Sequence, residues 1–273
     1  MAAVRAPAVA GTFYPGEAAA LTRTVDELLA AAPAARPAPR AIIVPHAGYI
    51  YSGSTAARAY RQVAAQTRRV VLLGPSHRVP VDGMALPGVA AYATPLGEVP
   101  LDAELVARAE AQPGVLTDPV AHAYEHSLEV QLPFLQRVLG EFTLLPLSVG
   151  RARTADVAGV INALWDPETL VVISSDLSHY HRYAEARRRD ERTLAQILAG
   201  GPDLDHYQAC GATPVNGMLV AAAGRGLAPT LLGACNSGDT AGDHDRVVGY
   251  AAVAYYPDPD APDPDRPDPE ETP

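Results

Sequence analysis

The chain has 273 residues, of which 48% are hydrophobic and 19% are charged, so it can bury a sizeable core in one large domain or two small ones. Its formal net charge is −10, and without a basic stripe it gives no argument for nucleic acid as a partner. Two cysteines do not make a disulfide scaffold, and no run approaches 18 apolar residues, which excludes a membrane span.

The two ends of the chain carry different information. The N-terminus lacks a charged start followed by a long apolar stretch, so we see no signal peptide and expect a soluble, cytoplasmic protein. Residues 257–273 form a Pro-Asp repeat with seven acidic residues and one basic residue, a net charge of −6 that leaves −4 for the remainder. Because such a segment cannot bury apolar surface, we expect one domain over residues 1–256 and a disordered acidic tail over 257–273.

The first half of the chain alternates helical and strand-like patterns. A Pro/Ala linker from Pro33 to Pro39 separates the first predicted helix from the first predicted strand, and Ser52 or Ser54 can cap the helix that follows this strand. We expect a helix over 17–32, a strand over 41–44, a helix through 56–60, a strand over 70–73, irregular strands and turns over 79–100, and a helix over 101–112.

The second half continues the alternation after a loop at Asp118 and Pro119. Pro133 lies inside a helical pattern and implies a kink or a late start. We expect helices over 127–140, 153–165, 183–199, 203–209 and 215–224, strands over 142–149, 169–174, 227–234 and 247–256, and a turn over 210–214. Strands that alternate with helices predict βαβ units, and hence an α/β fold with a mostly parallel or mixed sheet.

Three apolar runs end in a short polar segment that carries a histidine. These are His46 after residues 41–44, His77 after 70–73 and His179 after 170–173. In open α/β sheets the ligand site lies beyond the carboxyl ends of the strands, and imidazole is the commonest metal ligand. We therefore expect one site, although His46 or His77 taken alone could equally fix its own loop by hydrogen bonds.

Asp176 and His179 are spaced i, i+3, which places them on one face if the segment turns helically. A carboxylate beside an imidazole suits a general base or a group that fixes its tautomer. The alternative is that Asp176 caps a helix and His179 lies on the surface. A hydrolase triad with Ser178 is possible on paper, but these residues crowd one turn, whereas triads usually draw on separate elements.

His126 and Glu129 repeat this spacing at a predicted helix start. We assign His126 to the site, whereas Glu125 and Glu129 can be explained by the helix dipole alone. Four further histidines have no strand-end position and are expected to be surface or loop groups, namely His122, His181, His206 and His244.

Cys210 lies in a Gly- and Pro-flanked turn before a helix of small residues. A helix N-terminus favours the thiolate, which is both a nucleophile and a soft metal ligand. The alternative is a small buried hydrophobe, which is also how we interpret Cys235 at a strand end. The chain has no G-x-S-x-G, P-loop, G-x-G-x-x-G, H-E-x-x-H or paired C-x-x-C motif.

Taken together, eight segments resemble the Memo family, whose bacterial and archaeal members are called AmmeMemoRadiSam system protein B. They follow the family order between about residues 5 and 256. The segments are RAPAVAGTFYPG (5–16), IVPHAGYIYSG (43–53), LGPSH (73–77), EHSLEVQLPF (125–134), SSDLSH (174–179), CGATP (210–214), NSGD (236–239) and VGYAA (248–252).

The resemblance implies a single three-layer α/β/α domain that shares its fold with class III extradiol dioxygenases. It implies that His46 and His77 bind one iron or copper ion together with Cys210, which stands where the dioxygenases have a carboxylate. A thiolate shifts the metal preference towards soft metals and weakens a direct transfer of dioxygenase chemistry. Asp176, His179 and His126 would line the same pocket as catalytic residues, with no nucleotide cofactor.

The same resemblance suggests the substrate side and the partners of the site. Phe13, where animal members carry Trp, would form an aromatic wall, and Tyr51 and Ser76 would contact a small-molecule or peptide ligand. Radical-SAM and AMMECR1-like proteins are the implied partners, with no membrane involved. A metal-dependent redox enzyme is our first hypothesis, and the alternatives are a non-catalytic peptide- or anion-binding adaptor and a metal-handling protein.

Overall fold

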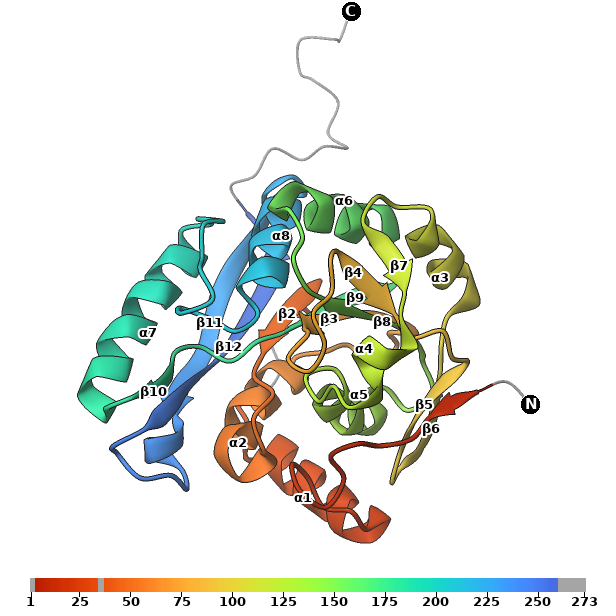
Figure 1. Cartoon of the computed structure of the whole chain (residues 1–273). Helices are drawn as coiled ribbons and strands as arrows, with labels where there is room; N and C mark the ends of the chain where they lie inside the picture. Colours follow the sequence, from red (N-terminus) through yellow and green to blue (C-terminus); the bar gives the residue numbers. More distant parts are fainter. Residues whose placement is uncertain (1–2, 34–36, 260–273) are drawn as a thin grey trace, which may run out of the picture.

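A computed structural model describes residues 3–33 and 37–259 of the chain. A nine-stranded sheet forms the middle layer, and helices cover both of its faces (Figure 1). Its strands run in both directions, so the sheet is mixed. The predicted α/β class and three-layer architecture are therefore confirmed.

Four parallel strands form the centre of the sheet, and each reads as a continuous apolar run because helices bury both of its faces. Antiparallel strands extend the sheet on both sides. In spatial order the strands are β10 (His179–His181), β12 (Val247–Pro257), β2 (Ala41–Val44), β9 (Thr169–Ser174), β3 (Arg69–Pro75), β8 (Thr143–Val149), β4 (Met84–Leu86) and β7 (Val115–Thr117), while β11 (Leu227–Asn236) also pairs with β12. The carboxyl ends of β2, β9 and β3 thus lie side by side.

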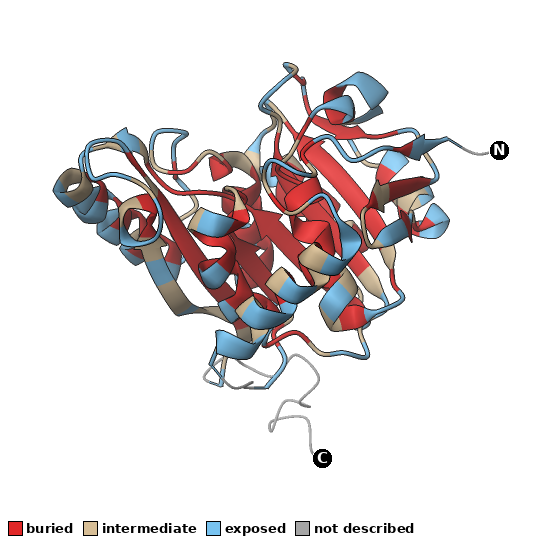
Figure 2. Ribbon diagram, turned by 90° about the horizontal axis from the view of Figure 1, so that it is seen from below, coloured by how far each residue is buried: buried red, intermediate tan, exposed pale blue. Residues whose placement is uncertain are grey.

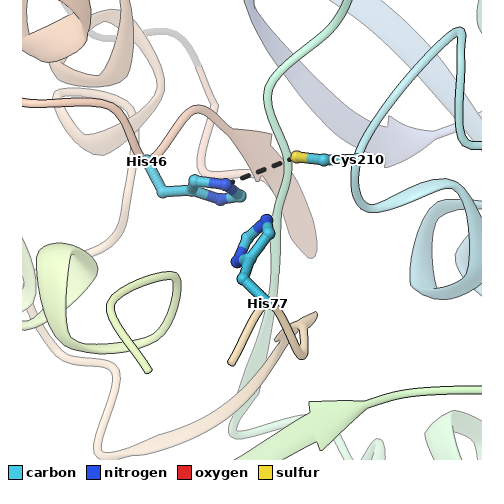
Figure 3. Close-up of side chains that lie close together, drawn as sticks. All are labelled: His46, His77 and Cys210. Atoms are coloured by element: carbon cyan, nitrogen blue, oxygen red, sulfur yellow. Dashed lines mark hydrogen bonds between the residues drawn. The ribbon is translucent and has the colours of Figure 1, made fainter. Parts of the chain in front are cut away.

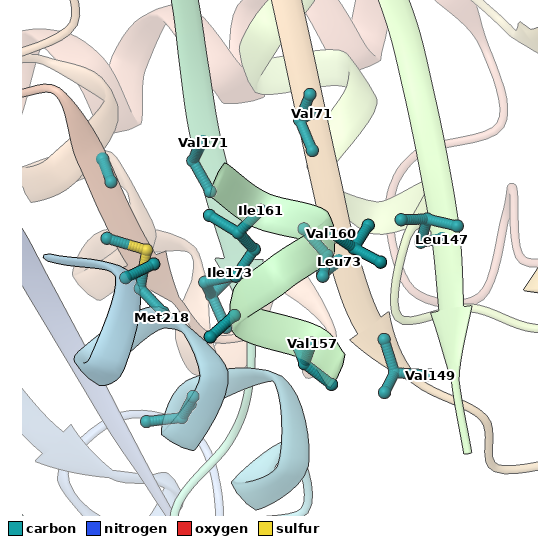
Figure 4. Packing of buried hydrophobic residues seen from close by; sticks show 14 of the residues in the cluster. Val71, Leu73, Leu147, Val149, Val157, Val160, Ile161, Val171, Ile173 and Met218 are labelled. Carbon is teal, nitrogen blue, oxygen red and sulfur yellow. The ribbon is translucent and has the colours of Figure 1, made fainter. Parts of the chain in front are cut away.

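Alternate residues of each central strand pack into two separate hydrophobic cores, one on each face of the sheet. In β3, Val71 and Leu73 face one layer of helices, and Val70 and Leu72 face the other. Figure 4 shows Ile161 packed among residues of the first core, in which each fully buried aliphatic side chain contributes about 1.5–3 kcal/mol. The first layer holds α3 (Ala103–Glu110), α6 (Thr154–Leu164) and α8 (Ala212–Ala223), and the second holds α1 (Ala18–Ala31), α2 (Tyr49–Tyr60) and α5 (Leu132–Leu139).

The remaining elements surround these layers. A long charged helix, α7 (Tyr183–Leu198), packs on β11 and β12 through the apolar face that carries Leu194. Figure 2 shows the sheet buried and the outer faces of the helices exposed. A small second sheet contains β1 (Val4–Arg5), β5 (Ala91–Thr94) and β6 (Gly97–Pro100), and short helices occur at α4 (Pro119–Ala123), η1 (Glu129–Gln131) and η2 (Ser237–Asp239).

Local structure departs from prediction where side chains bond to nearby backbone. The predicted helix over 203–209 is a turn, because Asp205 accepts the backbone N–H groups of residues 207 and 208 and so competes with helix formation. Neither Ser52 nor Ser54 caps α2, which begins at Tyr49 after Gly48. The predicted loop at Asp118 is instead the N-cap of the short helix α4.

Two further helix boundaries follow from elementary geometry. Pro133 lies in the first turn of α5, where its missing N–H costs nothing, so the late start is the correct alternative. The helix α8 begins at Ala212, inside the predicted turn, and Cys210 lies just before it. The apolar pattern alone could not mark these boundaries because neither helix has a capping side chain.

The chain ends are only partly described. The strand β12 extends to Pro257, one residue into the predicted tail, and residues 260–273 lie outside the described part of the chain. Among residues 3–33 and 37–259, no helix combines the length and the apolar character that crossing a membrane requires.

Candidate metal centre

A cleft of about 410 Å³ opens at the carboxyl ends of the central strands. Six of the eight histidines of the chain line it, and none of the described residues in its wall has an aliphatic side chain. The lining residues are His46, His77, Arg78, His126, Asp176, His179, Tyr180, His181, His206, Tyr207 and Cys210. The three strand-end histidines of the sequence therefore meet at one place, as expected from the topology of α/β sheets.

His46 follows β2 and is almost completely buried. Its backbone N–H donates to Oδ1 of Asp176 at 2.8 Å, and its Nδ1 lies 2.9 Å from Oγ of Ser174. Burial, reinforced by the neighbouring His77 and His126, lowers the pKa of His46 well below its ordinary value. The ring is therefore a neutral imidazole, the form in which histidine binds metals.

His77 follows β3 and is held by Glu125. Its Nδ1 lies 2.9 Å from Oε1 of Glu125, and its backbone N–H donates to Oε2. Burial alone would raise the pKa of Glu125, but the hydrogen bonds from His77 and from the backbone N–H of Ser127 outweigh it and hold this pKa well below its usual range. Because a carboxylate only accepts, His77 carries its proton on Nδ1 and leaves Nε2 unprotonated in the neutral ring.

Cys210 approaches these two rings from the turn before α8. Its Sγ lies 3.4 Å from Nε2 of His46, and one donor atom from each of His46, His77 and Cys210 lies within 4.8 Å of the other two (Figure 3). Burial, followed by the negative charge of Asp176, raises the pKa of the Cys210 thiol. The helix N-terminus does not outweigh these effects, so a thiolate at this position requires a nearby cation.

Gly211 allows the Cys210 turn to lie against the end of β9. A Cβ atom on this residue would lie 2.7 Å from Cβ of Ser175 and 2.8 Å from the carbonyl oxygen of Ser174. Only glycine can make this close approach without displacing the chain. Gly211 thus allows the preceding residue, Cys210, to place its thiol in the cleft.

Asp176 and His179 both lie in the cleft, but the condition of a helical turn between them is not met. Residues 175–178 form neither helix nor strand, and His179 begins β10, which pairs with β12. Nδ1 of His179 lies 2.8 Å from the carbonyl oxygen of Leu177, so this nitrogen carries the proton. Burial raises the pKa of Asp176 to about 7, opposed by the N–H of His46. Because Nδ1 of His179 bonds to Leu177 and not to Asp176, these residues do not form the hydrogen-bonded triad that a hydrolase would need.

His126 forms a wall of the cleft. Its ring centroid lies 4.8 Å from that of His77 and 4.8 Å from that of Phe13, and burial lowers its pKa to about 4. Glu129 does not line the cleft with His126, because its carboxylate bonds to Arg5 and to Tyr14. Glu129 therefore anchors the N-terminal segment of the chain.

The three residues expected on the substrate side lie outside the lining of this cleft. Phe13 contacts His126 but, together with Tyr51, lines a neighbouring groove of about 570 Å³. The hydroxyl of Ser76 donates to the carbonyl oxygen of Val79 within its own loop. A role for these side chains in ligand binding stays a prediction.

Several residues of the site were not found from the sequence. His181 and His206 line the cleft, a role that we did not assign to these surface or loop groups, because β10 and the turn over 205–209 border it. Tyr180 lies between two lining histidines with a φ of 63°, a left-handed conformation that is uncommon for a non-glycine residue. His122 and His244 lie elsewhere, the first buried against Tyr92 and the second on the exposed surface.

Comparisons with known proteins agree on one family. The family model described as "Memo-like protein" matches residues 5–254. A MEMO1 family protein of Aquifex aeolicus is 38% identical and covers 92% of this chain and 99% of its own. A MEMO1 family protein of Ignicoccus hospitalis is also 38% identical, over 92% of this chain and 98% of its own.

A solved structure shares the fold. The crystal structure of uncharacterized protein JW3007 from Escherichia coli K12 superposes with a TM-score of 0.55, at 16% sequence identity. The match covers 78% of this chain and 98% of the other chain. At this level of identity the likeness supports the architecture and nothing about the site.

Proposed function

Because this chain belongs to the Memo family, we propose that its cleft is a mononuclear metal centre, in which His46, His77 and Cys210 hold one iron or copper ion. The observation that carries the proposal is the convergence of three donor atoms from three separate segments. The 3.4 Å between Nε2 of His46 and Sγ of Cys210 is close to the separation of about 3.5 Å expected for nitrogen and sulfur bound at tetrahedral angles to one ion. The donor set therefore fits a metal.

The chemistry of the three donors favours a redox metal. Two imidazoles and one thiolate suit iron or copper better than magnesium or calcium, which prefer oxygen ligands. When bound, such an ion supplies one-electron chemistry and open positions for a small substrate or O₂. The raised pKa of Cys210 fits this proposal, because the positive charge of the ion would stabilise the thiolate that burial disfavours.

Residues around the three ligands can handle protons. Burial raises the pKa of Asp176 in the metal-free site, and this carboxyl can hold a proton there and release it when a cation binds beside it. His179 keeps its proton on Nδ1 against Leu177 and can accept another on Nε2. His126 stays neutral and shields one side of the cleft. We propose that these residues act on a small-molecule or peptide ligand, and that radical-SAM and AMMECR1-like proteins act in the same reaction sequence.

Anaerobic purification followed by mass spectrometry of bound metals tests the proposal. We expect near-stoichiometric iron or copper in the wild type and its loss in Cys210→Ala and His46→Ala. His244→Ala is the matched control, because this histidine is exposed and lies outside the cleft lining, and it should retain the metal.

Other outcomes select other functions. No metal in the wild type, even after reconstitution, overturns the proposal and leaves a peptide- or anion-binding adaptor. Stoichiometric zinc keeps the metal centre but overturns the redox role. Bound iron or copper without O₂ consumption in the presence of catechol-like substrates overturns a dioxygenase-like reaction and favours metal handling.

A further inference from the structure

A buried chain of hydrogen bonds lies behind His46, on the side away from Cys210. Tyr60 donates its hydroxyl hydrogen to Oε1 of Gln131 at 2.8 Å, and Nε2 of Gln131 donates to Oγ of Ser174 at 2.9 Å. The same Oγ lies 2.7 Å from the carbonyl oxygen of Ser127 and 2.9 Å from Nδ1 of His46. Water cannot relax the arrangement, because the polar groups of this chain are buried.

The amide of Gln131 has one possible orientation. Its Nε2 lies 2.9 Å from the carbonyl oxygen of Pro45 as well as 2.9 Å from Oγ of Ser174. If the amide were flipped, Oε1 of Gln131 would take the place of Nε2 and lie 2.9 Å from the carbonyl oxygen of Pro45, so that two acceptors would face each other. Burial raises the pKa of Tyr60, so its hydroxyl stays protonated and donates to Oε1. Both amide hydrogens of Gln131 are therefore committed, one to Pro45 and one to Ser174.

The hydroxyl of Ser174 has one hydrogen and two candidate acceptors. The carbonyl oxygen of Ser127 can only accept, and it lies at 2.7 Å. If the hydrogen went to His46 instead, Oγ and this carbonyl would face each other without a hydrogen between them, which leaves a buried acceptor unpaired at a cost of about 1–3 kcal/mol. The hydrogen therefore goes to Ser127, and Nδ1 of His46 must be the donor to Oγ.

We infer that Ser174, oriented by Gln131 and Ser127, is a positioning residue that fixes His46 in its Nδ1–H tautomer. Nε2 of His46 is then unprotonated and lies 3.4 Å from Sγ of Cys210. His77 reaches the same state through Glu125. In the neutral form of each ring, the unprotonated nitrogen is thus Nε2, which is the nitrogen that a metal requires.

This inference gives a role to a segment of which the proposed function uses only His126. The stretch EHSLEVQLPF (125–134) supplies Glu125 to His77 at its start and Gln131 to the hydrogen-bond chain of His46 near its end. Between them, the backbone of Ser127 provides the carbonyl that takes the hydrogen of Ser174. One segment outside the three ligands therefore sets the proton positions on both histidines.

Nitrogen NMR of the metal-free protein tests the tautomer directly. Long-range proton–nitrogen spectra of histidine-labelled protein distinguish a protonated from an unprotonated ring nitrogen, and the loss of signals in His46→Ala assigns them. We expect Nδ1–H in the wild type. In Ser174→Ala the buried Nδ1 loses its acceptor, so the ring should convert to the Nε2–H form, which can donate to Cys210. Ser174→Thr retains a hydroxyl and should restore Nδ1–H.

Ser148→Ala is the matched control. Ser148 is also a fully buried strand serine, and its Oγ has no partner among the described residues, so its removal should leave His46 unchanged. An Nε2–H tautomer in the wild type overturns the inference without any variant. An Nδ1–H tautomer that persists in Ser174→Ala overturns the role of Ser174.

The consequence for metal binding rests on the proposed metal centre, whereas the tautomer does not. Ser174→Ala should bind iron or copper 10–100-fold more weakly than Ser148→Ala in a chelator competition, the usual effect of removing a partner that orients a ligand. If the NMR result holds but no variant binds metal, the proposed function fails and the tautomer inference stands. If the wild type binds metal but its His46 ring is in the Nε2–H form when metal-free, the tautomer inference fails and the proposed function stands.

Discussion

Replacing Glu125 by Gln tests whether this buried carboxylate organises the cleft. Its Oε1 accepts from Nδ1 of His77 and from the backbone N–H groups of His126 and Ser127, and its Oε2 accepts from the backbone N–H of His77. The less damaging orientation of a glutamine places its NH₂ at Oε2, facing the backbone N–H of His77. The change loses one charge-assisted hydrogen bond of about 1.5–3 kcal/mol and weakens the other three, so we expect a loss of about 2–4 kcal/mol in the free energy of unfolding.

Urea denaturation at pH 7 measures this loss. Glu104→Gln is the control, because Glu104 forms exposed ion pairs with Arg69 and Arg108, and exposed pairs contribute about 0–1 kcal/mol. A Glu125→Gln variant that loses no more stability than Glu104→Gln would refute the reasoning, since it would show that the four donors find other partners.

The pH dependence of this difference has a definite sign. The pKa of Glu125 lies well below the value of 4.5 expected in the unfolded chain, because the hydrogen bonds of His77 and Ser127 outweigh burial. As the pH falls through 4.5, the unfolded state takes up a proton that the folded state refuses, so the stabilisation by the carboxylate declines. The wild type should therefore lose its advantage over Glu125→Gln progressively below about pH 4.5, and a constant difference from pH 7 to pH 3 contradicts this account.

Three further substitutions test other parts of the structure. Gly211→Ala should weaken metal binding and lower the free energy of unfolding by about 1–3 kcal/mol, because its Cβ would meet Ser175. Its control is Gly159→Ala, at an open position in α6, which should raise the free energy of unfolding by up to about 1 kcal/mol in the same urea titration. Arg5→Met should cost about 3–5 kcal/mol by calorimetry, because it leaves a buried carboxylate without its guanidinium; a loss below 1 kcal/mol contradicts this. Burial raises the pKa of Asp190 from 3.8 to about 6, so the folded state holds a proton that the unfolded chain releases. The contribution of this group to stability should therefore fall by about 3 kcal/mol as the pH rises between these values. Urea denaturation at pH 4 and pH 7 should show this fall in the wild type relative to Asp190→Asn, and an equal change in both proteins contradicts it.

The sequence predicts best those helices and strands whose own residue pattern identifies them, without reference to the elements that they pair with. The strands over 41–44 and 169–174 coincide with β2 and β9, because strands buried on both faces are apolar throughout. The three-residue strands β4 and β7 have no comparable signal, because they exist through pairing with each other and with β8. The helix expected over 203–209 failed because the side chain of Asp205 bonds to the following backbone.

The candidate site divides in the same way. His46 and His77 could be found from the sequence, because each directly follows an apolar run that marks a strand. The turn around Cys210 left a reactive thiolate and a buried hydrophobe equally open, so its assignment as the third ligand came only from the family resemblance. Glu125 looked like a helix-dipole residue, since nothing near it in the sequence shows that His77, 48 residues away, provides its hydrogen bonds.

The strand order explains why three similar strand ends have different roles. The strand β9 lies between β2 and β3, so its end lies between the two histidine-bearing loops. Ser174 at this end lies directly behind His46, and the chain after it carries Asp176 against the backbone of the same residue. The flanking strands can direct their histidines across the cleft towards Cys210, whereas the central strand supports His46 from behind and leaves His77 to Glu125. The sequence shows three equivalent ends, and only the order β2-β9-β3 distinguishes the supporting strand from the two that carry ligands.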